Sequence, residues 1–545
     1  MDSTAIRLSG RQWWLLIVAC LGVALVIAAM AALYTALPEI AADTGATQQQ
    51  LTWIIDGYTL LLACLVLPCG ALGDRYGRRL VLVLGLVVFS VASVLPLALD
   101  TPLWLIVARA LAGVGAALVM PSTLSLLTAN FPQSRRSAAI ATWAGVAGVA
   151  AVIGFLGSGV LLEYFSWLSI FVAMAIISVV LAVAGCTVID SAEDERPAMD
   201  PLGTVCSVAA VALLVIGLIE GPVRGWTDQV TLSALAGAVL AGLGFVFVEL
   251  RVARPLLDVR LFAVRGFGAG SVAVGMQFLA AFGTFLLIMQ FMQLFLGYSA
   301  LKSAVALAPM IVPMVLLAMV APYLAERFGL RLPTLIGVGM IGVALFGLSR
   351  LTADSGYTDL LWPLLVMSSG LGLSSPPATA AIIANTPPEK HGVASAVNDA
   401  AREVGAAIGI AVAGSVLAAG YTHKIAAVLP QLPEQARGPV EGSLAAAMEV
   451  AEQAGPQADP LVDAAQAAFM HGTGNASLAL GVLTVVAAVA LGVWAPGREA
   501  LAGPGVPVSD AAGSAREGDR VAAVPAAGSA ADGVPVSVSD AAGND

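Results

Sequence analysis

Apolar runs of roughly 20 residues, separated by short polar segments, recur along almost the whole chain. A bilayer core of about 30 Å is crossed by a helix of this length, so the pattern predicts fourteen membrane-spanning helices. They cover residues 13–37, 50–73, 79–99, 103–127, 138–162, 165–189, 201–220, 229–249, 267–296, 301–324, 331–350, 358–383, 393–420 and 474–495. A β-barrel would show alternating strands of about ten residues instead. The predicted fold class is therefore an all-α polytopic membrane protein.

Composition supports this prediction, because 59% of the residues are hydrophobic and 11% are charged, against roughly 45–50% and about 25% in soluble domains. The first run is longer than the apolar core of a signal peptide, about 7–15 residues, so it is expected to stay as the first span. Five cysteines lie in apolar runs without a CxxC pair, and neither a disulfide nor a metal site is expected.

Basic residues indicate the orientation. With the N-terminus in the cytoplasm, most Lys and Arg fall in cytoplasmic segments, as the positive-inside rule requires. The exceptions are Arg224, Lys302, Arg350, Lys424 and Arg437 outside, and Arg109 and Arg402 within spans. Residues 1–12 are then a cytoplasmic N-terminus, the segment 421–473 is an external loop, and both termini are cytoplasmic.

The stretch GALGDRYGRR, residues 70–79, is the predicted cytoplasmic turn between the second and third spans. A simple positive-inside anchor accounts for Arg78 and Arg79 taken alone. Asp74 lies at a helix end, where a carboxylate accepts hydrogen bonds from a helix N-terminus and pairs with an arginine, and Gly77 permits a tight turn. We therefore predict a charged latch that holds two parts of the protein together in one state and releases them in another. The latch residues here are Gly70, Asp74, Arg75, Gly77 and Arg78, and Arg79 follows them.

These residues reproduce the G-x-x-x-D-R-x-G-R-[KR] signature of the major facilitator superfamily, which the chain resembles. APYLAERFGLR, residues 321–331, repeats the core of the signature as Glu326, Arg327 and Gly329. Facilitators contain two six-helix halves related by duplication, which the resemblance places at 13–189 and 267–497. Residues 190–266 then hold a charged linker, two inserted helices and a basic amphipathic segment on the cytoplasmic surface.

Further stretches are similar to the fourteen-span drug:proton antiporters, which include quaternary-ammonium exporters and self-resistance exporters of antibiotic-producing bacteria. They are LTWIIDGYTL, LIVARALAGVGAA, MPSTLSLL and VNDAAREVGAAIGIAVAGSVL. The resemblance covers about residues 13–495. It implies a secondary exporter of lipophilic cationic or neutral compounds, exchanged for protons, in a bacterial inner membrane. The expected partners are the substrate, protons and lipid, without nucleic acid or a cofactor, and the protein is expected to be a monomer.

Ionisable residues inside spans are costly, so they are functional candidates. Asp56 lies at about the depth of Arg109, and we expect the two to pair, either as a structural salt bridge or as a proton-coupling site. Asp399, Arg402 and Glu403 share a helix face, which is either a coupling cluster or a wetted helix end. Candidates for a cavity lining, for which ordinary packing is the alternative, are Trp53, Tyr58, Met276, Gln277, Gln290 and Gln293.

Two positions depart from the resembled family. Its usual acidic residue in the first span is replaced by Ala29, and the proline of its fifth-span motif by Phe155. We expect a weaker kink in AAVIGFLGSG, with Gly154, Gly157 and Gly159 kept as a small-residue face for helix packing.

Energy coupling through a P-loop is not expected, since none of the three lysines follows a glycine. The histidines His391, His423 and His471 form no HExxH motif, and we expect no enzymatic activity. A nutrient importer and a transport-inactive sensor remain as alternatives to the exporter.

The polar segments are less informative. In the loop 421–473, the Ala-rich stretches 444–454 and 460–470 predict an amphipathic hairpin over the mouth of the protein, with a tolerated insertion as the alternative. Residues 498–545 are rich in Gly, Ala, Pro and Ser, a composition that predicts a disordered cytoplasmic tail.

Overall fold

The structure, a computed structural model, describes residues 9–46, 48–99, 101–189, 200–252, 255–387, 390–442, 444–454 and 459–497. All of them belong to one compact unit, Met1–Leu501. Residues 1–8, most of the charged linker and the predicted disordered tail lie outside the described residues, so those expectations stay as predictions.

The described residues form helices and no strands. In a bilayer every backbone group must be bonded within the protein, which a helix achieves by itself. The first six helices are α1 (Gly10–Thr44), α2 (Gln48–Tyr76), α3 (Arg78–Ala98), α4 (Pro102–Asn130), α5 (Gln133–Tyr164) and α6 (Leu168–Cys186). Then follow α7 (Pro201–Arg224), α8 (Gln229–Glu249) and the short η1 (Val259–Ala263).

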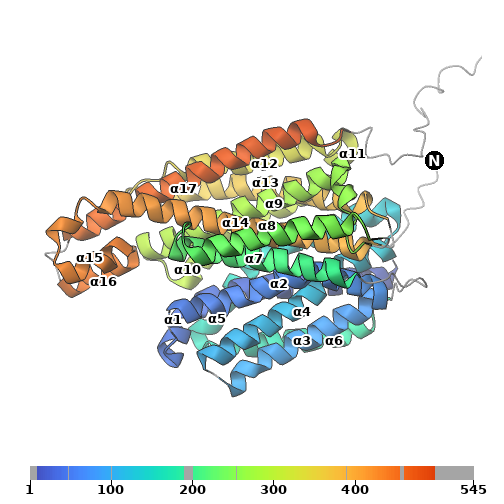
Figure 1. The fold of residues 1–545 in the computed structure, drawn as a ribbon, viewed down its shortest axis with the longest axis horizontal. Coiled ribbons are helices and arrows are strands. Elements are labelled where there is room, and N and C mark those ends of the chain that lie inside the picture. Colours follow the sequence, from blue (N-terminus) through green and yellow to red (C-terminus); the bar gives the residue numbers. More distant parts are fainter. Residues whose placement is uncertain are drawn as a thin grey trace, which may run out of the picture. The chain divides into compact units, whose positions relative to one another are not determined.

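The second half begins with α9 (Arg265–Gln290), which continues as a short π-helix, η2 (Phe291–Phe295). The next helices are α10 (Ala300–Leu307), η3 (Ala308–Met310), α11 (Ile311–Phe328), α12 (Arg331–Leu348), α13 (Tyr357–Ala384) and α14 (His391–Ile425). The last elements of the described part are η5 (Leu429–Gln431), α15 (Glu434–Gly442), α16 (Leu444–Ala454) and α17 (Asp459–Trp494), and Figure 1 shows the arrangement.

The same four helix pairings occur in both halves. In the first half α1 packs on α5, α2 and α3 both pack on α4, and α3 packs on α6. In the second half α9 packs on α14, α11 and α12 both pack on α13, and α12 packs on α17. The two halves therefore repeat one arrangement, and they meet where α2 and α4 contact α14 and where α5 contacts α10, α11 and α13.

Thirteen helices in the described part of the chain are long and apolar enough to cross a membrane, with α10 and α11 forming one of them. The expected span 358–383 corresponds to α13, which is not among the thirteen. Serines, glycines and three prolines, Pro363, Pro376 and Pro377, lower its hydropathy. With 28 residues, α13 is about 42 Å long, and it packs against α5, α9, α11 and α12. A helix surrounded by protein needs less apolar surface than one that faces lipid.

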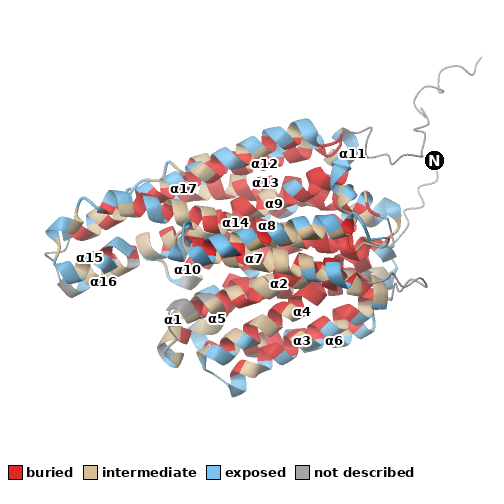
Figure 2. Cartoon of the chain, viewed as in Figure 1, coloured by how far each residue is buried: buried red, intermediate tan, exposed pale blue. Residues whose placement is uncertain are grey.

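The inserted pair lies at the edge of the bundle. In α7 and α8 only 22% and 17% of the spanning window is buried, against 72% in α1. Many positions of α8 are exposed, whereas those of α7 are more often half-buried (Figure 2). The predicted amphipathic segment 251–266 is not a long surface helix. It contains the five-residue η1 and then the first turn of α9, while residues 253 and 254 lie outside the described range.

The segment 421–473 is more helical than the sequence predicts. α14 continues to Ile425 and α17 already starts at Asp459, so residues 460–470 extend α17 instead of forming a separate helix. The stretch 444–454 forms α16, as expected. We call α15 and α16 the cap. It lies at the end of the bundle opposite Asp74, held by a hydrogen bond from the Tyr421 hydroxyl to the Val440 carbonyl, 2.9 Å.

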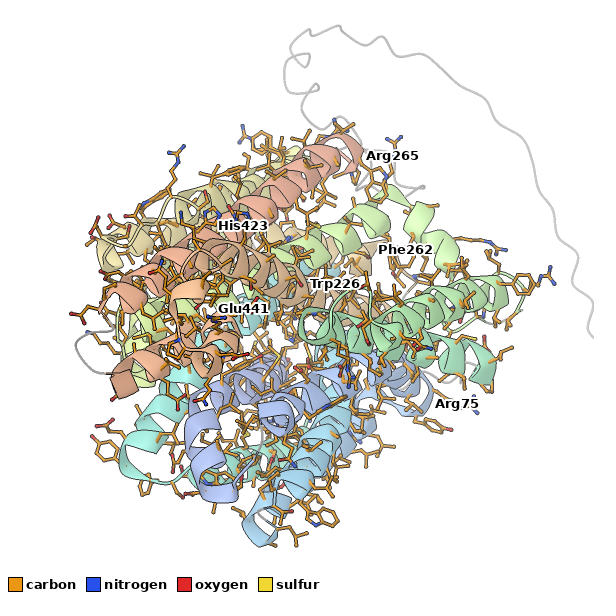
Figure 3. All side chains as sticks on the ribbon, turned by 60° about the vertical axis from the view of Figure 1, so that its left-hand side comes forward. Arg75, Trp226, Phe262, Arg265, His423 and Glu441 are labelled. Carbon is orange, nitrogen blue, oxygen red and sulfur yellow. The ribbon has the colours of Figure 1, made fainter. Side chains whose placement is uncertain are left out.

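The orientation predicts which end of this bundle is reached from outside the cell. Glu441, exposed on the cap (Figure 3), is changed to Cys in a background without the five native cysteines. We expect an impermeant maleimide to label this cysteine on intact cells. The matched control is Arg260→Cys, exposed in the predicted cytoplasmic segment, which should react only after permeabilisation. The reverse pattern would contradict the orientation.

Candidate functional site

The Asp74 carboxylate joins the two halves at one end of the bundle. Its side chain is 3% exposed near the end of α2. It accepts hydrogen bonds from the backbone N–H groups of Gly392, 2.9 Å, and Val393, 3.1 Å, in the first turn of α14. These groups have no partner within their own helix, and the helix dipole there favours a negative charge. This is the contact between halves that a latch requires.

Two glycines allow this contact. A Cβ atom on Gly392 would lie 2.5 Å from both the Asp74 Oδ1 and the Gly70 carbonyl oxygen, and a Cβ on Gly70 would lie 2.5 Å from the Gly392 carbonyl oxygen. Real Cβ atoms do not approach other atoms this closely. Gly70 and Gly392 therefore let α2 and α14 come close enough for Asp74 to reach the backbone of α14.

The arginines of the latch turn differ. Arg78 is 2% exposed, and its guanidinium lies 3.0 Å from Asp74 Oδ1, so the interpretation of Arg78 as a simple membrane anchor is wrong. Arg79 donates to the Val188 carbonyl at 3.3 Å, and Arg75 lies over the Tyr76 ring. Gly77 has a φ of 101°, a backbone conformation that side chains other than glycine rarely adopt.

The repeated turn in the second half keeps the backbone but lacks the bridge. Gly329 ends α11 with a φ of 80°. Glu326 and Arg327 are exposed, and Arg327 contacts Tyr323 and Phe328 on its own helix. Among the described residues we find no hydrogen bond from Glu326 to the first half. The Asp74 interaction thus has no counterpart there in this conformation.

Two adjacent chambers lie between the halves. The larger has a volume of about 380 Å³ and extends to the cap, where Leu444 of α16 and the neighbouring Phe469 of α17 line it. The smaller, of about 70 Å³, lies deeper. Met30, Phe282 and Glu403 line both chambers. Drug-sized ligands occupy cavities of about 300–1,000 Å³, so the larger chamber is wide enough for one.

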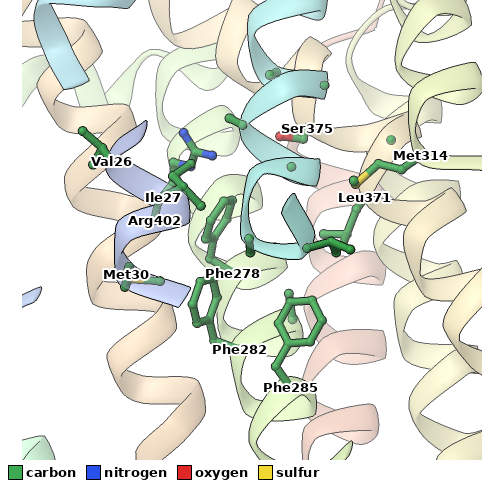
Figure 4. Close-up of a pocket in the computed structure, with 18 of the residues that line it drawn as sticks. Val26, Ile27, Met30, Phe278, Phe282, Phe285, Met314, Leu371, Ser375 and Arg402 are labelled. Carbon is green, nitrogen blue, oxygen red and sulfur yellow. The ribbon is translucent and has the colours of Figure 1, made fainter. Parts of the chain in front are cut away.

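Aromatic and thioether groups stand among the small and aliphatic residues that line the smaller chamber (Figure 4). Phe278, Phe282 and Phe285 follow one another along α9, at the i, i+4, i+7 spacing of one helix face. Met310 and Met314 come from η3 and α11. Such a surface accepts flat or lipophilic groups and, through the ring faces, cations.

Asp56 and Arg109 do not form the expected pair. No ion pair joins them among the described residues. The Arg109 side chain is fully buried, donates to the Ile54 carbonyl at 3.2 Å and lies 4.2 Å from the centre of the Tyr58 ring. Asp56 instead faces the larger chamber. Arg109 is therefore turned toward α2 and the Tyr58 ring, and Asp56 lines the cavity without it.

The cluster on α14 is buried rather than wetted. Asp399 has no exposed surface, and Arg402 is 4% exposed and lies 3.7 Å from it. The Arg402 guanidinium also lies over the rings of Phe278, 4.4 Å, and Trp143, 5.3 Å. Glu403, the next residue, faces both chambers. Asp56 and Glu403 thus bring one carboxylate from each half to the same cavity.

The other lining candidates separate into two groups. Tyr58 lines the smaller chamber and Gln290 the larger. The remaining four, Trp53, Met276, Gln277 and Gln293, lie outside both. Sequence reasoning missed Tyr34, which faces the larger chamber within electrostatic range of Asp56 and Glu403. A single tyrosine in an apolar run gives no signal that separates it from packing residues.

The fifth span packs as expected at two of its three glycines. A Cβ on Gly154 would lie 2.5 Å from the Ala28 carbonyl oxygen, and one on Gly159 would lie 3.0 Å from Leu301. Gly157 faces open space. Ser158, which replaces a glycine of the family motif, accepts a hydrogen bond from Thr35 at 2.8 Å. Ala29 is buried in the core of the first half and outside both chambers.

A match to a family model shows which protein family the chain belongs to. The model of the Major Facilitator Superfamily matches residues 19–410. The chain belongs to the major facilitator superfamily. It is thus a multi-pass membrane protein, as the span pattern and the latch signature predict.

Curated relatives within the superfamily are resistance and export proteins. The tetracenomycin C resistance and export protein of Streptomyces glaucescens is 32% identical over 497 residues, covering 88% of this chain and 91% of that protein. The multidrug efflux pump LfrA of Mycolicibacterium smegmatis is 32% identical, with 89% and 97% covered. The methyl viologen resistance protein SmvA of Salmonella typhimurium is 33% identical, with 89% and 98% covered.

Solved structures agree on the fold. The human organic anion transporter MFSD10 has a TM-score of 0.57 at 15% identity, covering 88% of this chain and 99% of that one. A bacterial homologue of the lysosomal transporter Spinster has a TM-score of 0.58 at 17% identity, covering 89% and 98%. At these identities the likeness shows the facilitator fold alone.

The latch geometry predicts that Asp74 matters far more than Arg79. Asp74→Asn removes the charge that faces both the α14 N-terminus and the buried Arg78, and breaking a buried pair costs about 3–5 kcal/mol. We expect the variant to reach the membrane at normal levels and to lose transport at least about a hundredfold. Arg79→Ala removes the hydrogen bond to the Val188 carbonyl, and this variant should keep most of the transport activity. Equal transport by Asp74→Asn and the parent protein would contradict the latch.

Proposed function

We propose that this facilitator is a secondary exporter that moves lipophilic, cationic or neutral drugs or antibiotics out of the cell in exchange for protons. The observation that carries the proposal is the cavity between the halves, apolar over most of its lining and faced by Asp56 and Glu403. The export and resistance roles of the similar proteins support it.

The carboxylates provide the exchange. A carboxylate that faces an apolar cavity is stabilised when either a cation or a proton neutralises its charge. The two therefore compete for the same carboxylate. A proton that arrives from one side therefore favours release of a bound cation, and its departure to the other side restores the site. A proton that crosses 100 mV releases about 2.3 kcal/mol, enough for roughly a fiftyfold gradient of a neutral substrate.

Glu403 is the first candidate for the coupling group. It lies beside Arg402, with which it interacts electrostatically, and it faces both chambers, so movement of the halves changes its surroundings. Asp56 lacks the arginine partner that the sequence predicts, which makes it the second candidate and a recognition group for the substrate cation. Glu403 and Asp56 belong to opposite halves, so alternating access brings them together and separates them.

Flux in proteoliposomes tests the proposal. With the membrane potential clamped by valinomycin and potassium, an acidic interior should drive uptake of ethidium, a lipophilic monocation, as protons leave the vesicle. A proton-coupled importer would instead take up ethidium when the exterior is acidic. A sensor would give the same signal as protein-free vesicles under both gradients. Either of these results would contradict the proposal that the protein is a proton-coupled exporter.

Variants locate the coupling group in the same assay. Glu403→Gln should lose ethidium-induced proton release, and the double variant with Asp56→Asn should also lose binding of the cation. The matched control is Glu163→Gln, an exposed acid on α5, which should behave as the parent. Proton release that persists in the double variant would exclude both carboxylates.

A further inference from the structure

The helix α7 lies where the two halves meet. It packs against α2 of the first half and α14 of the second, and its other neighbour is α8. Only 22% of the spanning window of α7 is buried, and more of its positions are half-buried than exposed, yet Val215 is only 4% exposed and Leu218 only 8%. One face of this partly exposed helix is therefore turned into the protein.

That face lines the larger chamber. The chamber is bounded by Val215, Leu218, Ile219 and Pro222 together with Asp56 and Glu403. The four α7 residues have the spacing i, i+3, i+4 and i+7, so they form one stripe along the helix. An apolar stripe from the inserted pair thus shares a cavity with both candidate carboxylates.

Contacts fix the position of this stripe. Trp226, in the turn after α7, donates from Nε1 to the Ser415 hydroxyl of α14 at 2.9 Å. At the other end the Asp200 carboxylate caps α7 by accepting from the Gly203 N–H at 2.9 Å. α8 supports the helix from outside, because Leu235 packs on Gly217 and Leu213 packs on Gly237.

We propose that α7 is a wall of the substrate site, and that Leu218 and Ile219 set the width of the compound that this wall accepts. The inference rests on the proposed function. The substrate class is an amphiphilic cation whose charge is placed near Asp56 and Glu403 and whose apolar part packs against the α7 stripe. The inserted helices are then part of the selectivity of the exporter and not a peripheral addition to two complete halves.

Competition measurements test this role. Symmetric tetraalkylammonium ions from tetraethyl to tetrapentyl compete with ethidium flux in proteoliposomes. Leu218→Trp narrows the chamber and should shift the preferred competitor to smaller ions, and Leu218→Ala should shift it to larger ones. The ratio of inhibitory concentrations should change about tenfold, because one methylene in an apolar pocket changes selection roughly 10–200-fold.

The matched controls are Leu240→Trp and Leu240→Ala on α8, where Leu240 is 70% exposed on the outer surface. Both variants should rank the tetraalkylammonium ions as inhibitors of ethidium flux in the same order as the parent protein does. If the parent transports ethidium and the Leu218 variants keep the same order as the Leu240 variants, this inference is overturned and the proposed function stands. A parent without flux overturns the proposed function instead.

A chemical readout covers the case in which Leu218→Trp fails to fold. Ile219→Cys, in a background without the native cysteines, should react with a soluble maleimide, and saturating ethidium should slow the reaction at least about tenfold. The control Arg260→Cys, exposed outside the spans, should react at a rate that ethidium does not change. Equal reaction rates for Ile219→Cys with and without ethidium would contradict the proposal that α7 lines the substrate site.

Discussion

A single buried carboxylate reaches across the boundary between the two halves of this protein at one end of the bundle. Asp74 on α2 is neutralised from two sides, by the free N–H groups at the start of α14 and by Arg78. The carboxylate and arginine are both buried and belong to the same half, so only the two hydrogen bonds to α14 are lost when the halves separate. Gly70 and Gly392 make the approach possible because neither carries a side chain.

The chambers lie away from this contact, toward the cap. Asp56 on α2 and Glu403 on α14 line the larger one. α7, which packs on both α2 and α14, contributes its apolar stripe to the same chamber. The contact at Asp74 and the opening toward the cap thus lie at opposite ends of α14 in this conformation.

The sequence predicted the features that depend on local pattern. Long apolar runs gave the spans, and the G-x-x-x-D-R-x-G-R-R spacing located the turn at which Gly77 has a positive φ. The run 358–383 is predicted as a span, yet α13 is less apolar than the thirteen other spans, because a helix enclosed by protein carries serine, glycine and proline. The local sequence pattern does not show which residue a charged side chain will pair with.

The remaining errors of the sequence predictions concern the direction in which side chains point. Asp56 and Arg109 lie at similar depth, yet Arg109 turns to the Tyr58 ring and the Ile54 carbonyl, whereas Asp56 turns to the cavity. Depth along a helix follows from counting residues, but direction depends on the packing of neighbouring helices. For the same reason the stripe on α7 could be recognised as a helix face in the sequence, whereas its position over the substrate chamber could not.

The most direct test of the account is the distance between the halves at the Asp74 end. Spin labels at Leu80 on α3 and Phe328 on α11, both exposed, report this distance by double electron–electron resonance. We predict a single short distance in the parent protein and a major longer one in Gly392→Ala, whose added Cβ would lie 2.5 Å from Asp74 Oδ1. Gly157→Ala, with open space around the added atom, should match the parent. A Gly392→Ala distribution identical to that of the parent would contradict the claim that this contact holds the halves together.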